Sequence, residues 1–210
     1  MKETTLILMS DTHEQHRKVS VPAGDVLIHA GDFTYFDRAA RITEDFNAWL
    51  DELPHKHKIV VPGNHESRAD GSRWIERITA ATVLINGGTE IDGLRIWGSP
   101  NCLKDWGAFG SSTADELAAL YGRIPLKTDI LVTHGPPFGI LDRAPGAASQ
   151  GGRELLAAVR TVKPRLHVFG HIHQGYGRFS RDNGTVFVNA ALAGPSYRMT
   201  KEPISISLNF

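Results

Sequence analysis

The sequence has a single cysteine, Cys102, among 210 residues, which excludes an internal disulfide framework and a metal site built from several thiolates. Basic and acidic residues are balanced at 23 each, so no excess of positive charge favours a nucleic-acid scaffold or an anionic membrane surface. The first apolar run ends at Asp11 after a few residues, and no run is long enough for a signal-peptide core or a transmembrane span. We therefore expect a cytoplasmic protein with neither a membrane nor a nucleic-acid scaffold as partner, and the oligomeric state stays open.

Short apolar runs rich in valine, isoleucine and leucine recur along the chain, and 41% of all residues are hydrophobic. Each run has the length of a β-strand, and most end in glycine or proline. The runs are residues 5–10, 26–31, 58–63, 82–87, 94–99, 129–135, 166–171, 185–191 and 204–210. The last run alternates apolar and polar residues up to Phe210, which predicts one buried face. The others are apolar nearly throughout and predict strands buried on both faces.

Three intervening segments have the spacing of amphipathic helices. The first has Asp37 as its expected N-cap, and its apolar face would be Ile42, Phe46, Trp49, Leu50 and Leu53. In the second, Thr113 and Glu116 form a capping-box pattern, and the apolar face would be Leu117, Leu120, Tyr121 and Ile124. The third spans 152–163, ends before Pro164 and would bury Leu155, Leu156, Val159 and Val162.

Strands that alternate with helices predict an α/β fold in which helices cover the strands. We expect residues 1–210 to form one domain, because the chain shows no linker, internal repeat or low-complexity tract. Two segments, 99–112 and 135–152, lack regular patterning, and irregular segments of that length are usually functional or disordered.

Metal-capable side chains follow five of the expected strands. They are Asp11 and His13, Asp32, Asn64 with His65, His134, and finally His171 and His173. Ligand sites of α/β sheets form beyond the carboxyl ends of the strands, so one shared site explains all five strand ends. Taken singly, each aspartate has an alternative as a turn cap, and each histidine has one as a packed core residue.

The set of donors indicates what such a site would bind. The seven candidates Asp11, His13, Asp32, Asn64, His134, His171 and His173 are too many for one tetrahedral zinc ion and include no thiolate. They suit two adjacent divalent metal ions. A mixed set of oxygen and imidazole ligands accepts several metals, and we expect manganese, with iron, zinc, cobalt or nickel as alternatives.

The ordered motifs D-x-H, G-D, G-N-H-E, T-H-G and G-H-x-H, from Asp11 to His173, resemble those of the calcineurin-like metallophosphoesterase superfamily. The segments "IHAGDFT", "IVVPGNHE", "DILVTHGPP", "HVFGHIHQGYG" and "VNAA" are similar to the metallophosphoesterase-domain-containing subgroup known from animal brain and its bacterial relatives. This resemblance implies a four-layer α/β/β/α sandwich with two mixed β-sheets.

The resemblance also implies roles for the motif residues. One metal would be held by Asp11, His13, Asp32 and His173, and the other by Asp32, Asn64, His134 and His171, with Asp32 as the bridge. Asp32, Asn64 and His65 would form the catalytic set, in which His65 protonates the leaving alkoxide or stabilises its charge. The alternative for His65 is a turn histidine hydrogen-bonded to Glu66.

The implied activity is that of a dinuclear-metal phosphodiesterase on small phosphodiesters such as cyclic nucleotides, with a metal-bridging hydroxide as nucleophile. The alternatives are a phosphomonoesterase, either a nucleotidase or a protein phosphatase, and a nucleotide-binding scaffold with weak turnover. Aromatic and polar residues of the two irregular segments could wall a pocket and contact a nucleobase. They are Asn101, Trp106, Phe109, Phe138 and Asp142–Arg143.

Two departures from related families bear on these roles. The segment "GDFTY" also resembles the metal-ligating block of purple acid phosphatases, but those enzymes lack the histidine of D-x-H, so we expect Tyr35 to line the pocket or to pack. Ser/Thr phosphatases orient their catalytic histidine with a D-R-G sequence, whereas Asp37–Arg38 comes two residues later than that pattern requires. The orientation of His65 is therefore open. The histidines outside the motifs are expected to be structural or solvated, namely His16, His29, His55, His57 and His167.

Overall fold

The computed structural model describes residues 3–35, 39–68, 71–103, 109–111, 113–177, 179–182 and 184–209. The expected N-cap Asp37, its neighbour Arg38, the loop residue Trp106 and the last residue Phe210 lie outside these ranges. The α-helices of the described residues are α1 (Ala39–Glu52), α2 (Ala114–Tyr121) and α3 (Arg153–Val162). Short 3₁₀ helices are η1 (His16–Lys18), η2 (Asn64–Arg68), η3 (Gly71–Arg77) and η4 (His173–Gly175).

The first β-sheet has the strand order β13-β1-β2-β3-β4. Its strands are β1 (Glu3–Met9), β2 (Val26–His29), β3 (His57–Val60), β4 (Thr82–Val83) and β13 (Ile204–Asn209). The pairings from β1 to β4 are parallel, and β13 pairs antiparallel with β1. The carboxyl ends of β1, β2 and β3 therefore lie at one edge of this sheet.

The second β-sheet has the strand order β11-β12-β10-β9-β6-β5. Its strands are β5 (Gly87–Ile91), β6 (Leu94–Ser99), β9 (Ile130–Thr133), β10 (Leu166–Phe169), β11 (Phe179–Asp182) and β12 (Thr185–Asn189). The inner pairings are parallel, and the edge strands β5 and β11 are antiparallel to their neighbours. A parallel bridge between Ser10 and Ala191 joins the two sheets just beyond β1 and β12.

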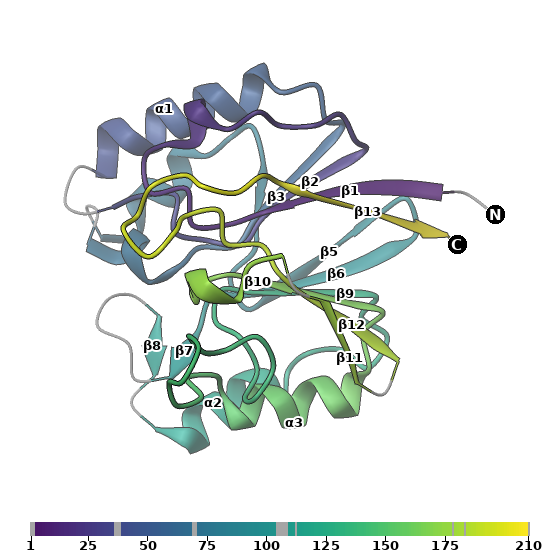
Figure 1. Cartoon of the computed structure of the whole chain (residues 1–210). Coiled ribbons are helices and arrows are strands. Elements are labelled where there is room, and N and C mark those ends of the chain that lie inside the picture. Colours follow the sequence, from purple (N-terminus) through teal and green to yellow (C-terminus); the bar gives the residue numbers. More distant parts are fainter. Residues whose placement is uncertain are drawn as a thin grey trace.

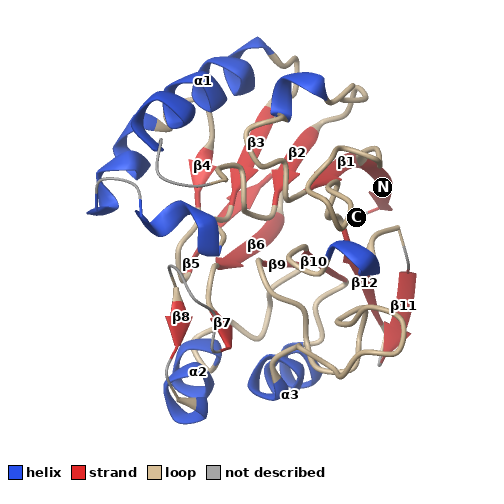
Figure 2. Cartoon of the chain, turned by 60° about the vertical axis from the view of Figure 1, so that its left-hand side comes forward, coloured by secondary structure: helices blue, strands red, loops and turns tan. Residues whose placement is uncertain are grey.

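The two sheets and their helices form four layers (Figure 1). Apolar side chains of both sheets meet in the middle, among them Leu8, Ile28, Val132 and Val168. Figure 2 shows α1 on one side of the strands and α2 and α3 on the other. Burial of Phe46 and Trp49 fixes α1, while Leu117, Leu155 and Val159 fix α2 and α3. The expected α/β/β/α sandwich with two mixed sheets is confirmed.

Burial along the strands follows the sequence patterns. Strands β2, β9 and β10 are buried at every residue, as their continuous apolar runs predict. Strand β13 alternates half-buried and exposed residues, as its period of two predicts. The capping prediction for α2 is also confirmed, because the Thr113 side chain accepts a hydrogen bond from the Glu116 amide at 3.2 Å. This helix ends at Tyr121, so buried Ile124 lies beyond it.

Three parts of the strand prediction were wrong. The run 82–87 forms only the two-residue strand β4, and residues 87–91 form β5, which turns into β6 at Asp92–Gly93 with φ angles of 50° and 86°. An Asp-Gly pair favours this tight hairpin, but the polar sequence of β5 hides its strand character. Strand β11 was also missed. The segment 99–112, expected to be irregular, contains β7 (Cys102–Leu103) paired with β8 (Gly110–Ser111).

Candidate metal centre

The turns after the strands direct the candidate ligands into one site. Asp11, His13, Asp32 and His171 all have left-handed backbone conformations, with φ between 40° and 65°. Aspartate and histidine are among the residues enriched in this region, yet each such residue costs roughly 1–2 kcal/mol relative to a right-handed one. Strain of this kind gathers at functional sites, where the surrounding structure holds it in place.

Glycines allow the strand ends to approach one another. A Cβ atom on Gly170 would collide with the Asp11 carboxylate and the Ser10 side chain. A Cβ atom on Gly63 would collide with the Asp32 carboxylate. The glycine before each of the motif residues Asn64 and His171 is therefore required by the close packing around the two carboxylates.

A first group of donors comprises Asp11, His13 and His173. The Nε2 atoms of His13 and His173 are 3.3 Å apart, and His173 Nε2 lies 3.3 Å from Asp11 Oδ1. The distance from His13 Nε2 to Asp11 Oδ1 is 3.9 Å. One nitrogen or oxygen from each side chain thus faces a common point.

A second group comprises Asp32, His134 and His171. His134 Nε2 lies 3.3 Å from Asp32 Oδ2 and 2.9 Å from Asn64 Oδ1, and the rings of His134 and His171 have centroids 5.0 Å apart. Asp32 also belongs to a third group with His13 and His65, whose donor atoms lie within 4.8 Å of one another. The Asp32 carboxylate is therefore within reach of both sets of imidazoles.

Backbone carbonyls define the tautomers of the site histidines. The Nδ1 atoms of His13, His134 and His173 lie 2.9–3.0 Å from the carbonyl oxygens of Thr34, Ala30 and Gly194. A carbonyl can only accept, so each Nδ1 carries a proton, and each Nε2 is the atom that faces the site and offers a lone pair when the ring is neutral. This hydrogen bond to the distant ring nitrogen is typical of metal-binding histidines.

The carboxylates of the site are buried and ionised. Without a metal ion, burial alone would raise the pKa of Asp32, but the charge of protonated His134 and its hydrogen bond hold that pKa well below its ordinary value. Burial opposes ionisation of Asp11 in the same way, and His173, His134 and His13 together lower its pKa. Buried anions beside imidazoles that can release their Nε2 proton to a metal are a donor set that fits divalent metal ions of intermediate softness.

His65 lies beside these groups and is oriented through the backbone. Its Nδ1 donates to the Tyr35 carbonyl oxygen at 2.5 Å, its amide donates to Asp32 Oδ1 at 3.0 Å, and its Nε2 lies 3.7 Å from Asp32 Oδ2. The Tyr35 carbonyl thus orients the His65 ring. In Ser/Thr phosphatases the D-R-G sequence has this task. The ring of Tyr35 packs against that of His65, and Tyr35 as a whole residue is 37% exposed.

Glu66 fixes the loops that carry Asp32 and His65. Its fully buried carboxylate accepts hydrogen bonds from the amides of Asp32, Thr34 and Gly63. Burial and the neighbouring Asp32 charge raise the Glu66 pKa to about 7. This glutamate is a positioning residue whose acceptor role the sequence analysis did not predict.

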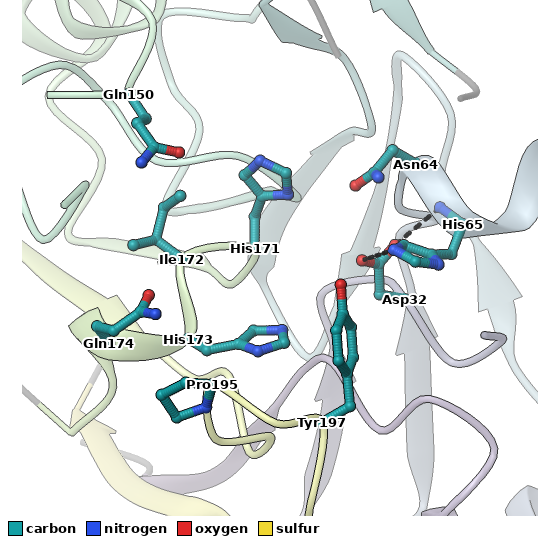
Figure 3. A pocket seen from close by; sticks show the side chains of 10 residues that line it. All are labelled: Asp32, Asn64, His65, Gln150, His171, Ile172, His173, Gln174, Pro195 and Tyr197. Atoms are coloured by element: carbon teal, nitrogen blue, oxygen red, sulfur yellow. Dashed lines mark hydrogen bonds and ion pairs between the residues drawn. The ribbon is translucent and has the colours of Figure 1, made fainter. Parts of the chain in front are cut away.

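A polar pocket of about 330 Å³ opens in front of the site (Figure 3). It is lined by Asp32, Asn64, His65, Gln150, His171, Ile172, His173, Gln174, Pro195 and Tyr197. The sequence analysis missed Gln150, Ile172, Gln174, Pro195 and Tyr197. Pro195 and Tyr197 belong to the segment between β12 and β13. This segment contains Gly-Pro and lacks strand or helix periodicity. That pattern would have marked it as a third functional loop.

The expected loop residues have other positions. Phe138 packs under the Arg153 guanidinium at 3.7 Å, and buried Asp142 accepts hydrogen bonds from the amides of Gly139 and Gly151, so it shapes its own loop. Asn101 lines a small cavity that shares Gln150 and His171 with the pocket. Of segment 135–152, Gln150 reaches the pocket.

The histidines outside the motifs are mainly core residues. His16, His29, His55 and His167 are buried, as expected for histidines with a structural role. Burial lowers the pKa of His29 and of His167 to about 3, so both are neutral at pH 7.

No α-helix of the described ranges is long and apolar enough to span a membrane.

The chain is similar to several known proteins. The family model for calcineurin-like phosphoesterases matches residues 4–175. Human metallophosphoesterase domain-containing protein 1 is 38% identical over 98% of this chain and 71% of its own length. A UPF0046 protein of Caenorhabditis elegans is 37% identical over 95% of this chain and 73% of its own length. The crystal structure of TT1561 from Thermus thermophilus has a TM-score of 0.60 at 15% identity, over 90% of this chain and 89% of that one, which shows a shared fold.

The two-sheet sandwich and its buried aspartate and histidine clusters define a metallophosphoesterase-type hydrolase. The chain belongs to the calcineurin-like phosphoesterase family. Proteins of this family use divalent metal ions, and the three His/Asp groups described above are the candidate ligands in this chain.

Proposed function

We propose that this chain is a dinuclear-metal phosphodiesterase acting on small phosphodiesters such as cyclic nucleotides. Asp11, His13, Asp32 and His173 would hold one divalent ion, and Asp32, Asn64, His134 and His171 the other. When bound, two such ions would supply a hydroxide nucleophile near neutral pH and positive charge for the phosphoryl oxygens. The observation that carries the proposal is the position of Asp32, within donor-atom reach of both imidazole sets.

The charge of the pocket supports a diester over a monoester. The described lining residues include neither lysine nor arginine. Two divalent ions carry four positive charges, and the carboxylates of Asp11 and Asp32 with one hydroxide offset three of them, which leaves about one. A monoanionic diester matches that balance, whereas a dianionic monoester would leave a negative charge without a cationic side chain beside it.

The residues of the chain then have distinct tasks. Asp32 and Asn64 both lie close to His134 Nε2, with Asp32 Oδ2 at 3.3 Å and Asn64 Oδ1 at 2.9 Å. His65 keeps its Nδ1 proton on the Tyr35 carbonyl, so its Nε2 is the atom that can hold a proton for the leaving oxygen. The cavity of about 330 Å³ is at the small end of the usual range for small-molecule sites, about 300–1,000 Å³.

The experiment removes metal from the protein with a chelator and restores manganese, iron, zinc, cobalt or nickel singly. Hydrolysis of bis(4-nitrophenyl) phosphate is then compared with hydrolysis of 4-nitrophenyl phosphate. The proposal expects diester turnover that disappears on stripping, returns with metal and exceeds monoester turnover, and cyclic nucleotides would then be screened. Faster monoester hydrolysis would indicate a phosphomonoesterase. Two bound metals per chain with no turnover would indicate a binding protein.

A further inference from the structure

Tyr197 stands at the pocket with a fixed orientation. Its ring makes edge contacts with His13 and His173, at centroid distances of 4.8 and 5.2 Å, and with Tyr35 at 4.9 Å. A fourth edge contact, at 6.3 Å, reaches His65. Figure 3 shows the phenol upright in the pocket, with its hydroxyl end directed toward Asp32 and His65.

The backbone of Tyr197 is held in an unfavourable conformation. Its φ angle is +59°, in the left-handed region that bulky residues rarely occupy. Its amide donates to the Gly194 carbonyl at 2.9 Å, and its own carbonyl accepts from the Gln15 side chain at 2.7 Å. A strained residue that is held by contacts on both sides indicates a functional constraint on where the side chain points.

The segment between β12 and β13, which carries Tyr197, also supports the candidate metal centre. The Gly194 carbonyl accepts the Nδ1 proton of His173, and Lys201 Nζ donates to the carbonyl oxygens of His173 and Ala193. The loop thus joins the orientation of His173 to the placement of the Tyr197 phenol. Gln150 and Gln174 lie across the pocket from this phenol (Figure 3).

We propose that the Tyr197 hydroxyl is a substrate contact that donates a hydrogen bond to a phosphoryl oxygen of the bound ester or of inorganic phosphate. The inference deepens the proposed phosphodiesterase function and rests on it for the identity of the ester. A neutral donor suits this site, because it binds a phosphoryl oxygen without adding the positive charge that would favour a dianion. Rigid mounting of the phenol limits the entropy lost when the ligand binds.

The test uses Tyr197→Phe, which keeps the ring and removes the hydroxyl. Metal content is measured by elemental analysis, and the Kd for inorganic phosphate by calorimetry on the manganese-loaded protein at about pH 6.5, where phosphate is mainly a monoanion as a diester is. We expect unchanged metal content and a phosphate Kd raised about 10-fold or more, because a hydrogen bond to an anion is lost. The matched control is Tyr176→Phe, whose hydroxyl donates to the Glu202 carbonyl instead. The control should keep its phosphate Kd within about twofold of wild type.

The outcomes separate this inference from the proposed function. If the wild type hydrolyses neither ester but binds phosphate, and Tyr197→Phe weakens that binding, the function fails and the role of Tyr197 stands. A phosphate Kd within about twofold of wild type in Tyr197→Phe, with both metals present, would overturn the role of Tyr197. Loss of metal from Tyr197→Phe would also overturn it, because the hydroxyl would then act on the metal centre. Absence of phosphate binding by the metal-loaded wild type would overturn it as well.

Discussion

The Nε2 atoms of His13 and His173 face each other at 3.3 Å, although the two residues are 160 positions apart in the chain. Both rings donate their Nδ1 proton to a backbone carbonyl, so in the neutral rings both facing nitrogens carry lone pairs. Two lone pairs repel each other unless a cation or a proton lies between them. The adjacent carboxylate of Asp11 also favours a positive charge at this position. The fold therefore brings distant residues together into a place that attracts positive charge.

His65→Ala should retain both metals and lose activity. Because removal of a general acid typically costs 100-fold or more, we expect a loss of about that size on diesters with poor leaving groups. The loss should be smaller for 4-nitrophenyl esters, whose leaving group needs little protonation. Rates on a series of aryl diesters of increasing leaving-group pKa, with metal content measured alongside, provide the test. An equal loss across the series would remove His65 from proton transfer.

Glu66→Ala should destabilise the protein. The substitution leaves the amides of Asp32, Thr34 and Gly63 without their buried acceptor. A buried amide that loses its partner costs about 1–3 kcal/mol, so the free energy of unfolding should fall by about 3 kcal/mol or more. Urea denaturation measures this loss, and Glu66→Gln, which keeps one acceptor oxygen, should lie between wild type and Glu66→Ala. A stability equal to wild type in Glu66→Ala would show that these amides find other partners.

His167 should make the fold sensitive to acid. Burial lowers its pKa from 6.5 to about 3, and its Nε2 lies 2.8 Å from Thr133 Oγ1. Below pH 6.5 the unfolded chain binds a proton that the folded protein rejects until about pH 3, so the free energy of unfolding falls as the pH drops through this window. The contribution reaches about 1.4 kcal/mol per pH unit.

This contribution can be isolated with His167→Gln. Urea denaturation of the metal-free proteins between pH 6.5 and pH 4 should show a shallower loss of stability for the variant than for wild type. Metal-free protein is used because acid also releases metals from imidazole ligands. Parallel pH profiles for the two proteins would show that His167 is not a buried neutral residue.

The strands, the helices and the grouping of strand-end aspartates and histidines could be predicted from local patterns, whereas the four layers were implied by the family resemblance. Continuous apolar runs identify buried strands such as β9 and β10, and polar residues directly after such strands identify the site edge. The orientation of His65 was not predictable, because its partner is the backbone carbonyl of Tyr35, which no side-chain motif encodes. Tyr197 was missed for a related reason, since only the tertiary contacts of its loop bring it to the pocket.

The central claim is that seven strand-end residues form one site for two metals, with Asp32 shared between them. Elemental analysis of manganese-loaded protein tests it most directly, with Asp32→Ala compared with Asp11→Ala and with the surface variant Asp45→Ala. We predict two metals per chain in wild type and in Asp45→Ala, about one in Asp11→Ala and close to none in Asp32→Ala. Two metals retained in Asp32→Ala would contradict the shared ligand and the account built on it.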